Sequence, residues 1–251
     1  MRKTLPFFAA AVMVGLLVGS GLPVRAQEGA VHAPDGGTRQ TVQSIVIPPA
    51  TNAPFTATVT TELTRLMPDG STMTNRNHRT VARDGSGRVF QERRYFTPDG
   101  DSQVTRLSEL DYQDPNRHEL YICHPAAKEC DLYRYDQPAT VALPKAGPLA
   151  NGMGSVTLED LGRKTIESLD VVGSREVTTI SIGAIGNQKA EPIVKEFWYS
   201  PYLGINLITK RFDPRASAIQ NFIVSGISLT EPDPKMFLPP TDFRVVKMDG
   251  Q

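Results

Sequence analysis

The chain has 251 residues, with 39% hydrophobic and 22% charged side chains, and its 27 basic residues balance its 27 acidic ones. Such a balance excludes the strongly basic surface of a nucleic-acid-binding protein, so we expect no nucleic-acid partner. The length is enough for one large domain to bury its own core, whereas two domains would each be small. We therefore expect a single globular domain.

The first 26 residues have the organisation of a secretory signal peptide. Arg2 and Lys3 precede an apolar run over 5–18, and small residues stand at Val24 and Ala26, as signal peptidase requires. Cleavage there removes three of the 27 basic residues, which leaves 24 against 27 acidic residues and a formal charge of −3. The apolar run is too short to span a hydrocarbon layer of about 30 Å. Because no cysteine near the cleavage point could carry a lipid anchor, we expect a periplasmic or secreted protein with no stable membrane span in the mature chain.

Residues 27–54 are rich in proline and glycine and offer few apolar side chains. Such a stretch cannot bury enough surface to offset the entropy of ordering itself. We predict a flexible leader, in which residues 42–47 are a candidate edge strand. The folded β-rich domain is then expected to cover residues 55–251.

From Phe55 onward the apolar residues recur with a period of two, which is typical of a half-buried β-strand. In the first strand Phe55, Ala57, Val59 and Leu63 share one face. Turn signals with Asp-Gly follow at 68–70, 84–85 and 98–100. Later segments enriched in β-branched and aromatic residues are predicted strands: 104–112, 119–123, 130–135, 164–172, 175–182, 193–199, 205–212 and 219–229.

Helix signals are scarce. The stretch from Ser155 to Leu169 is a candidate for one short helix, although its apolar positions fit the 3.6-residue period only in part. Successive strands joined by short turns predict an antiparallel meander. We therefore expect a mainly β protein, a curved antiparallel sheet or incomplete barrel with few or short helices.

The two cysteines, Cys123 and Cys130, flank a short connector between two tyrosine-bearing segments. In an oxidising compartment we expect them to form one disulfide across that hairpin. The alternative is a zinc site that adds His118 and His124, but neither ligand pair has the close spacing of a zinc knuckle. The disulfide is the preferred interpretation.

Catalytic constellations are not recognisable, and we predict a binding protein rather than an enzyme, with no catalytic, cofactor-binding or metal residue. The fragment Gly152-Met153-Gly154-Ser155-Val156 does not match the Gly-x-Ser-x-Gly elbow of serine hydrolases. His78, His118 and His124 stand beside turn or charged residues and are interpreted as surface histidines. A hydrolase whose chemistry resides on loops is the third alternative.

Two charged patterns have both a functional and a structural interpretation. Glu109 and Asp111 share one face of a predicted strand, where two carboxyls can share a proton or simply meet solvent. A basic run offers bidentate donors to a headgroup, phosphate or carboxylate. We prefer a solvated sheet face, partly neutralised by Asp84 and Glu92, because exposed charges contribute little to stability. The run consists of Arg76, Arg79, Arg83, Arg88, Arg93 and Arg94.

The C-terminal third, from Leu161 to Val246, carries short motifs in a distinctive order. Phe197-Trp198-Tyr199 leads into a Ser-Pro turn, a basic strand follows, and the end contains Pro232-Asp233 with Phe237 four residues later. This order resembles the LolA-like class of secreted proteins, which includes periplasmic lipoprotein carriers and the amino-terminal domain of RseB-type regulators. The resemblance implies a curved, incomplete antiparallel barrel. Its concave apolar face, covered by one or two helices, would receive acyl chains or a peptide.

Two classes of function follow. In the first, an exported bacterial envelope protein binds a hydrophobic ligand or a lipoprotein acyl chain on the concave face of the sheet. In the second, an RseB-like interaction or sensor domain binds another envelope protein by strand addition, without a small ligand. The predicted ligand face sets the apolar rows of two paired strands side by side. It consists of Ile205 and Leu207 on one strand and Ile219, Ile223 and Ile227 on the next.

Overall fold

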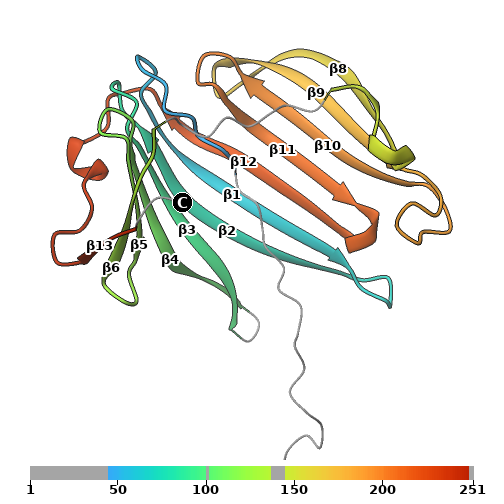
Figure 1. Ribbon diagram of the computed structural model, residues 1–251, viewed down its shortest axis with the longest axis horizontal. Coiled ribbons are helices and arrows are strands. Elements are labelled where there is room, and N and C mark those ends of the chain that lie inside the picture. Colours follow the sequence, from blue (N-terminus) through green and yellow to red (C-terminus); the bar gives the residue numbers. More distant parts are fainter. Residues whose placement is uncertain (1–44, 100–101, 137–144, 249–251) are drawn as a thin grey trace, which may run out of the picture. The chain divides into compact units, whose positions relative to one another are not determined.

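The computed structural model describes residues 45–99, 102–136 and 145–248, all of which belong to one unit, Gln43–Gln251. The predicted signal peptide and the predicted leader up to residue 44 lie outside the described residues. Thirteen strands form one sheet, drawn in Figure 1. The first six are β1 Phe55–Leu66, β2 Thr72–Arg83, β3 Val89–Asp99, β4 Ser102–Asp114, β5 Glu119–His124 and β6 Glu129–Arg134. The others are β7 Gly147–Pro148, β8 Gly154–Ile166, β9 Leu169–Ile180, β10 Glu191–Ser200, β11 Ile205–Asp213, β12 Ala218–Ser228 and β13 Arg244–Lys247.

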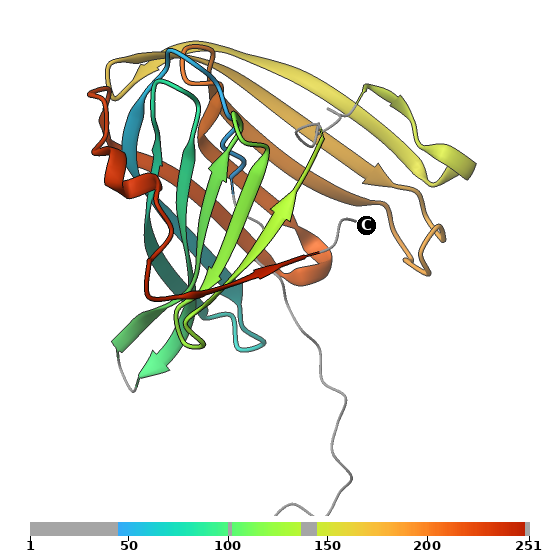
Figure 2. The same ribbon diagram turned by 60° about the vertical axis from the view of Figure 1, so that its left-hand side comes forward.

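The sheet consists of two antiparallel meanders. Strands β1 to β6 follow one another on one side and β7 to β12 on the other, and the pairing of β1 with β12 joins them. β13 pairs in parallel with β6. Figure 2 shows that the resulting sheet is open and curved. The predicted mainly β fold with a curved antiparallel sheet is confirmed.

Helical residues are confined to three short 3-10 turns within the described residues: η1 Ala150–Gly152, η2 Pro214–Ala216 and η3 Pro234–Phe237. The helical cover that the resemblance implies is therefore not found in this part of the chain. No helix of the described ranges is long and apolar enough to cross a membrane.

The short helix predicted over 155–169 is wrong. Its residues form β8 and the hairpin turn that leads into β9, and the two strands pair along their whole length. The turn is Glu167-Ser168, whose φ angles are +50° and +66°. Hairpin turns with positive φ usually carry Gly or Asn, so a turn signal is missing from the sequence here. For the same reason the predicted strands 164–172 and 175–182 have the wrong bounds.

Gly173 lies inside β9, not in the turn that the predicted strands required. A Cβ at this position would lie 2.7 Å from the Trp198 ring and 2.8 Å from Leu161 Cβ. Trp198 stands opposite Gly173 in the β9–β10 register. The glycine is explained by the close approach of the indole ring to the backbone.

Residues 45–54 belong to the core, although they fall within the predicted flexible leader. Ile45 and Ile47 are 7% and 3% exposed and pack with Phe55 of β1. Figure 2 shows this segment, in blue, on the inner side of the curved sheet. Residues 45–47 form no strand, and the rest of the candidate edge strand lies outside the described residues. The core therefore begins earlier than the predicted boundary at Phe55.

The predicted disulfide between Cys123 and Cys130 is confirmed, with an S–S distance of 1.98 Å. The two residues stand directly opposite each other on β5 and β6 and are fully buried against Tyr112 of β4. Because both sulfurs are bonded to each other, they are not free to ligate zinc. The described residues hold no other group of three side chains suited to a metal ion.

Candidate ligand-binding face

The buried side chains of the central strands point to one side of the sheet, which we call the inner face. Its apolar centre consists of Val59 on β1, Phe222 and Val224 on β12 and Leu207 on β11, all of them buried. Val59 is paired with Val224 across the β1–β12 ladder, so the side chains form a continuous surface. Among the described residues, Ile45 and Ile47 of the N-terminal coil pack on this surface.

The five residues of the predicted ligand face do not lie side by side. Ile205 and Leu207 are buried on the inner face. Ile219 and Ile223 lie on the opposite face and are 45% and 37% exposed. Ile227 follows an irregularity in the β1–β12 pairing and packs, partly buried, against the core.

The register of β11 with β12 explains this outcome. Ile208, not Leu207, is paired with Ile223, and Phe212 is paired with Ile219. Directly opposed residues of an antiparallel pair share a face, so both isoleucines lie on the outer face of the sheet. Both strands carry apolar residues at both parities, which is why the sequence did not reveal the register.

A row of ion pairs crosses the outer face between the Ile208–Ile223 pair and the Phe212–Ile219 pair. Arg175 of β9 binds Glu159 of β8 at 2.8 Å and Glu196 of β10 at 3.3 Å. Lys210 of β11 lies 3.7 Å from Glu196, and the Trp198 indole donates to the same carboxylate at 3.2 Å. The outer face of β8 to β11 therefore carries a row of charged side chains.

On the inner face, polar side chains gather where β2 and β3 part. The two strands share a short ladder of three residue pairs. Beyond it, side chains replace the backbone bonds: the Thr80 amide donates to Glu92 Oε2 at 3.1 Å, and Asn77 Nδ2 donates to the Arg94 carbonyl at 2.7 Å. Polar groups can therefore enter the sheet here without leaving backbone donors unpaired.

We call the polar group at this end of the inner face the Arg79 cluster. Arg79 and Asp111 are only 6% and 8% exposed. Arg93 Nε donates to Asp111 Oδ2 at 2.8 Å and lies 3.9 Å from Glu109 Oε1. Five buried atoms of the cluster have no hydrogen-bond partner: Arg79 Nε, Arg79 Nη2, Asn77 Oδ1, Gln91 Oε1 and Asp111 Oδ1. Buried polar atoms normally find partners, so this concentration marks the site.

Burial perturbs two ionisable groups of the Arg79 cluster in opposite ways. Desolvation, together with the neighbouring Arg93 charge, lowers the pKa of Arg79 to about 10, so the guanidinium stays charged at neutral pH. Desolvation and the Asp111 carboxylate raise the pKa of Glu109 to about 7. The carboxyl pair that the sequence pointed to is thus brought together, and one member holds a proton far more strongly than an ordinary glutamate.

Arg83, four residues from Arg79 on the same strand and face, is fully buried but paired throughout. Its guanidinium donates to the carbonyls of Ala53 at 3.0 Å, Pro48 at 2.9 Å and Leu203 at 2.8 Å. These bonds tie the N-terminal coil and the β10–β11 turn to β2. Arg83 is a structural residue.

The preferred interpretation of the basic run as a solvated face is therefore wrong for Arg79 and Arg83. Their positions share the parity of buried Val81, a signal that was present in the sequence. Asp84 and Glu92 neutralise part of the run, as expected: Arg88 binds Asp84 at 2.6 Å and Arg94 binds Glu92 at 3.1 Å.

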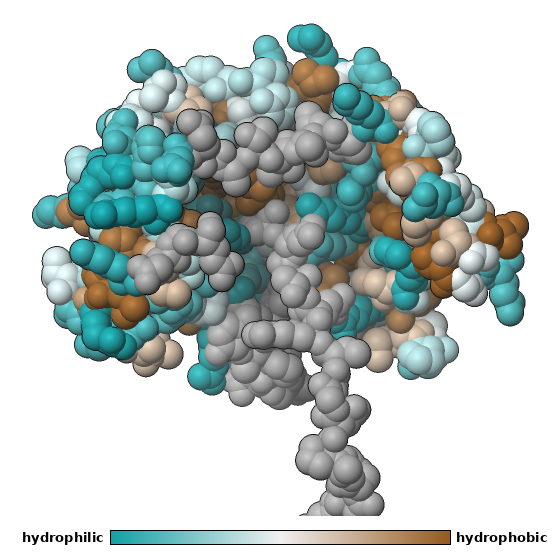
Figure 3. All heavy atoms as spheres, in the orientation of Figure 1, coloured by the Kyte–Doolittle hydropathy of each residue, from teal (hydrophilic) through white to brown (hydrophobic). Residues whose placement is uncertain are grey.

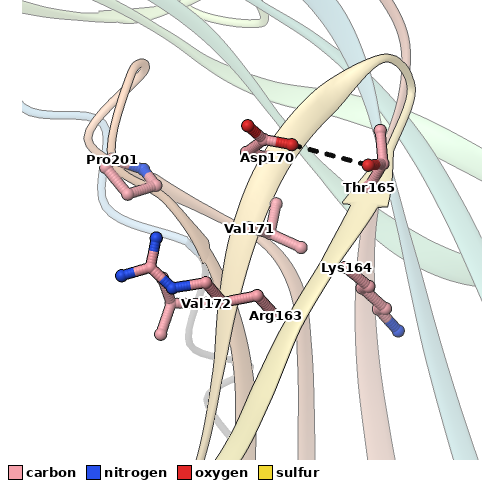
Figure 4. A pocket seen from close by; sticks show the side chains of 7 residues that line it. All are labelled: Arg163, Lys164, Thr165, Asp170, Val171, Val172 and Pro201. Carbon is pink, nitrogen blue, oxygen red and sulfur yellow. Dashed lines mark hydrogen bonds between the residues drawn. The ribbon is translucent and has the colours of Figure 1, made fainter.

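A pocket of about 320 Å³ lies at the β8–β9 hairpin (Figure 4). It is lined by Arg163, Lys164, Thr165, Asp170, Val171, Val172 and Pro201. Thr165 donates to Asp170 at 3.5 Å, and Lys164 Nζ is engaged 3.5 Å from the centroid of the Trp198 ring. Charged and exposed side chains dominate this pocket, so it does not suit an acyl chain.

Elsewhere the surface is mixed. Figure 3 shows hydrophilic and hydrophobic residues interspersed, with brown residues toward the end that carries β8 to β10. Leu158, Ile182 and Ile185 are exposed there. His78 and His118 are exposed as expected, and the partly exposed His124 lies 3.4 Å from Asp131.

No protein-family model matches the sequence, and no curated protein matches it. Solved structures match at low identity. An uncharacterised conserved protein from Thermus thermophilus is 11% identical over 78% of this chain and 91% of that one, with a TM-score of 0.43. The Pseudomonas aeruginosa MucA/MucB complex is 14% identical over 78% of this chain and 59% of the matched chain, with a TM-score of 0.39. A LolA superfamily protein from Nitrosomonas europaea is 14% identical over 74% of this chain and 90% of that protein, with a TM-score of 0.31. The predicted resemblance to the LolA-like class thus appears among solved structures too.

Proposed function

We propose that this chain is an exported bacterial envelope protein that binds a hydrophobic ligand, such as the acyl chain of a lipid or lipoprotein, on the inner face of its sheet. One observation carries the proposal. The apolar centre of the inner face is covered, among the described residues, by the coil around Ile45 and Ile47 and by no helix or second sheet. Because a sheet needs a second layer, a coil cover can be exchanged for an acyl chain at modest cost.

An uncharged probe tests the proposal. N-phenyl-1-naphthylamine fluoresces when it enters an apolar site, and we expect the purified protein to bind it at micromolar concentration. Truncating the cover with Ile45→Ala and Ile47→Ala should increase probe binding. Val46→Ala is the matched control, because Val46 lies between them and is 64% exposed. A protein that binds no probe, with or without its cover, contradicts the proposal.

The alternative, an envelope interaction or sensor domain that binds by strand addition, has one supporting feature. Beyond its two pairs with β7, the outer edge of β8 is unpaired among the described residues. However, this edge carries Glu159, Asp160, Arg163 and Lys164 and has an irregular pairing at Gly162. Charges and bulges are the devices by which proteins prevent edge pairing. We therefore prefer acyl binding. If the protein binds no probe, strand addition becomes the preferred function.

Export is a further part of the proposal. It rests on the signal-peptide pattern of residues 1–26 and on a disulfide, which persists in oxidising compartments. Amino-terminal sequencing of the protein from the envelope fraction should begin at Gln27. An intact Met1 form in the membrane would contradict it.

A further inference from the structure

The Arg79 cluster adjoins the apolar centre of the inner face. Arg79 stands directly opposite Val59 in the β1–β2 register, and Val59 is paired in turn with Val224. A buried cation and a buried apolar surface therefore meet on neighbouring strands. That arrangement matches a ligand with a charged end and an apolar chain.

The two unpaired nitrogens of Arg79 define which charged end fits. Nε and Nη2 lie along one edge of the guanidinium, and this edge donates two parallel hydrogen bonds to the oxygens of a carboxylate or phosphate. Both atoms are buried without a partner. Buried charged donors without a hydrogen-bond partner are costly, so this edge favours an anion.

The Asp111 carboxylate partly offsets the lowering of the Arg79 pKa, but neither neighbouring carboxyl hydrogen-bonds to Nε or Nη2. Asp111 binds Arg93 through Oδ2 at 2.8 Å. Glu109 lies toward Arg93 as well, and its raised pKa of about 7 leaves it only partly ionised at neutral pH. Two guanidinium groups thus face two carboxyls, of which Glu109 is only partly ionised at neutral pH, and the cluster keeps a net positive charge.

We infer that the Nε–Nη2 edge of Arg79 binds the carboxylate or phosphate head of an acyl amphiphile whose chain lies on the apolar centre of the inner face. The inference rests on the proposed function, which supplies the chain. It adds the chemical class of the head: an anion with two oxygens that can face the guanidinium edge.

Displacement of N-phenyl-1-naphthylamine by three competitors with the same chain length tests the inference. Laurate and dodecyl phosphate should displace the probe from the wild-type protein at concentrations at least about tenfold lower than dodecanol, since charge-assisted hydrogen bonds are the strong ones. Arg79→Gln should bring both anions to the level of dodecanol and leave dodecanol unchanged. Arg76→Gln is the matched control: Arg76 lies on the same strand, its side chain is 64% exposed, and it points to the outer face. This variant should keep the preference.

The outcomes separate the two proposals. If the probe binds and the three competitors act equally on the wild-type protein, the head site is wrong and the proposed function stands. If the probe does not bind, the proposed function is wrong and the inference that rests on it is overturned as well. Inorganic phosphate provides a further arm in calorimetry. If inorganic phosphate binds as tightly as dodecyl phosphate, the site binds free anions, and the inference that its ligand is an amphiphile is overturned.

A folding defect in Arg79→Gln would not hide the result, because the competitor preference is measured on the wild-type protein. Arg79→Lys is the second variant. It keeps the charge but lacks the two-donor edge, so we expect an intermediate preference for the anions. An unchanged preference in Arg79→Lys would show that charge alone is sufficient and would overturn the bidentate geometry.

Discussion

Two arginines on one strand show how the two ends of the inner face differ. Arg83 and Arg79 lie four residues apart on β2, face the same side and are both buried. Arg83 donates to three carbonyl groups of the chain itself. Arg79 has two buried nitrogens with no partner. Burial alone therefore does not distinguish the two arginines, whereas their hydrogen-bond partners do.

The difference follows from what surrounds each side chain. At Arg83 the N-terminal coil and the β10–β11 turn present backbone carbonyls to the guanidinium. At Arg79 the neighbouring strand has separated from β2, and no group of the described residues hydrogen-bonds to the Nε and Nη2 atoms of Arg79. The backbone of the chain thus satisfies the guanidinium at one end of the inner face, whereas the guanidinium edge at the other end is left without a partner in the described part of the chain.

The largest effect should come from breaking the structural end. Arg83→Met leaves three carbonyl oxygens without their donor, and each buried acceptor left unpaired costs about 1–3 kcal/mol, so we expect a loss of about 3–5 kcal/mol. Arg79→Met removes an unpaired charge and should leave the free energy of unfolding unchanged or raise it. Urea denaturation of both variants, with unchanged m-values, measures this contrast. Equal destabilisation would refute the distinction between the two arginines.

The two faces of the sheet can be compared in the same way. Leu207→Ala on the buried inner face should cost about 2–5 kcal/mol, whereas Ile223→Ala on the outer face should cost less than about 1 kcal/mol. The reason is exposure, since Leu207 is fully buried and Ile223 is 37% exposed. Denaturant titration of the pair of variants decides between the observed register and the sequence-based one, which puts both residues on one face.

The disulfide hairpin lies beside the binding end, because β5 pairs with β4, which carries Asp111. Closing a loop of about eight residues restrains the unfolded chain by roughly 2.5 kcal/mol in the loop-entropy model, so the variant with both cysteines changed to alanine should lose about that much. Thiol counting on the unreduced, denatured protein should find no free thiol. Two reactive thiols would contradict the bond.

Much of the fold could be predicted from the sequence, since period-two patterns mark strands regardless of their partners. The parity of Phe55, Ala57 and Val59 on the buried face is an example. Turns without glycine were not predictable in this way, and the Glu167-Ser168 turn forms a hairpin where a helix was expected.

The candidate site was less accessible to sequence reasoning. Register depends on contacts between strands, so the pairing of Ile208 with Ile223 could not be predicted from either strand alone. The alternation along the strand puts Arg79 on the same face as Val81 and so indicates burial. Arginine side chains are usually exposed, however, and the residue type therefore favours a solvated face. Whether a buried arginine has partners depends on segments far away in the sequence, as the bond between Arg83 and Leu203 illustrates.

The smallest expected effect, and the most specific to the binding end, is a dependence of stability on pH. Glu109 faces Asp111 on its own strand, Arg93 on β3 and His124 on β5. Burial and the Asp111 carboxylate outweigh both basic groups and raise the pKa of Glu109 from 4.5 to about 7. The folded state therefore binds a proton that the unfolded chain has already released.

The sign of the effect follows from this difference. A raised pKa in the folded state contributes stability that is fully present below pH 4.5 and is lost as the pH rises to about 7. Glu109→Gln cannot titrate, so its melting temperature should fall less than that of the wild-type protein over this window. Glu159→Gln, which removes an exposed carboxylate from the outer face, should retain the wild-type profile. A Glu109→Gln protein with the wild-type profile would show that solvent reaches the Arg79 cluster, and the contrast between Arg79 and Arg83 would then lose its electrostatic basis.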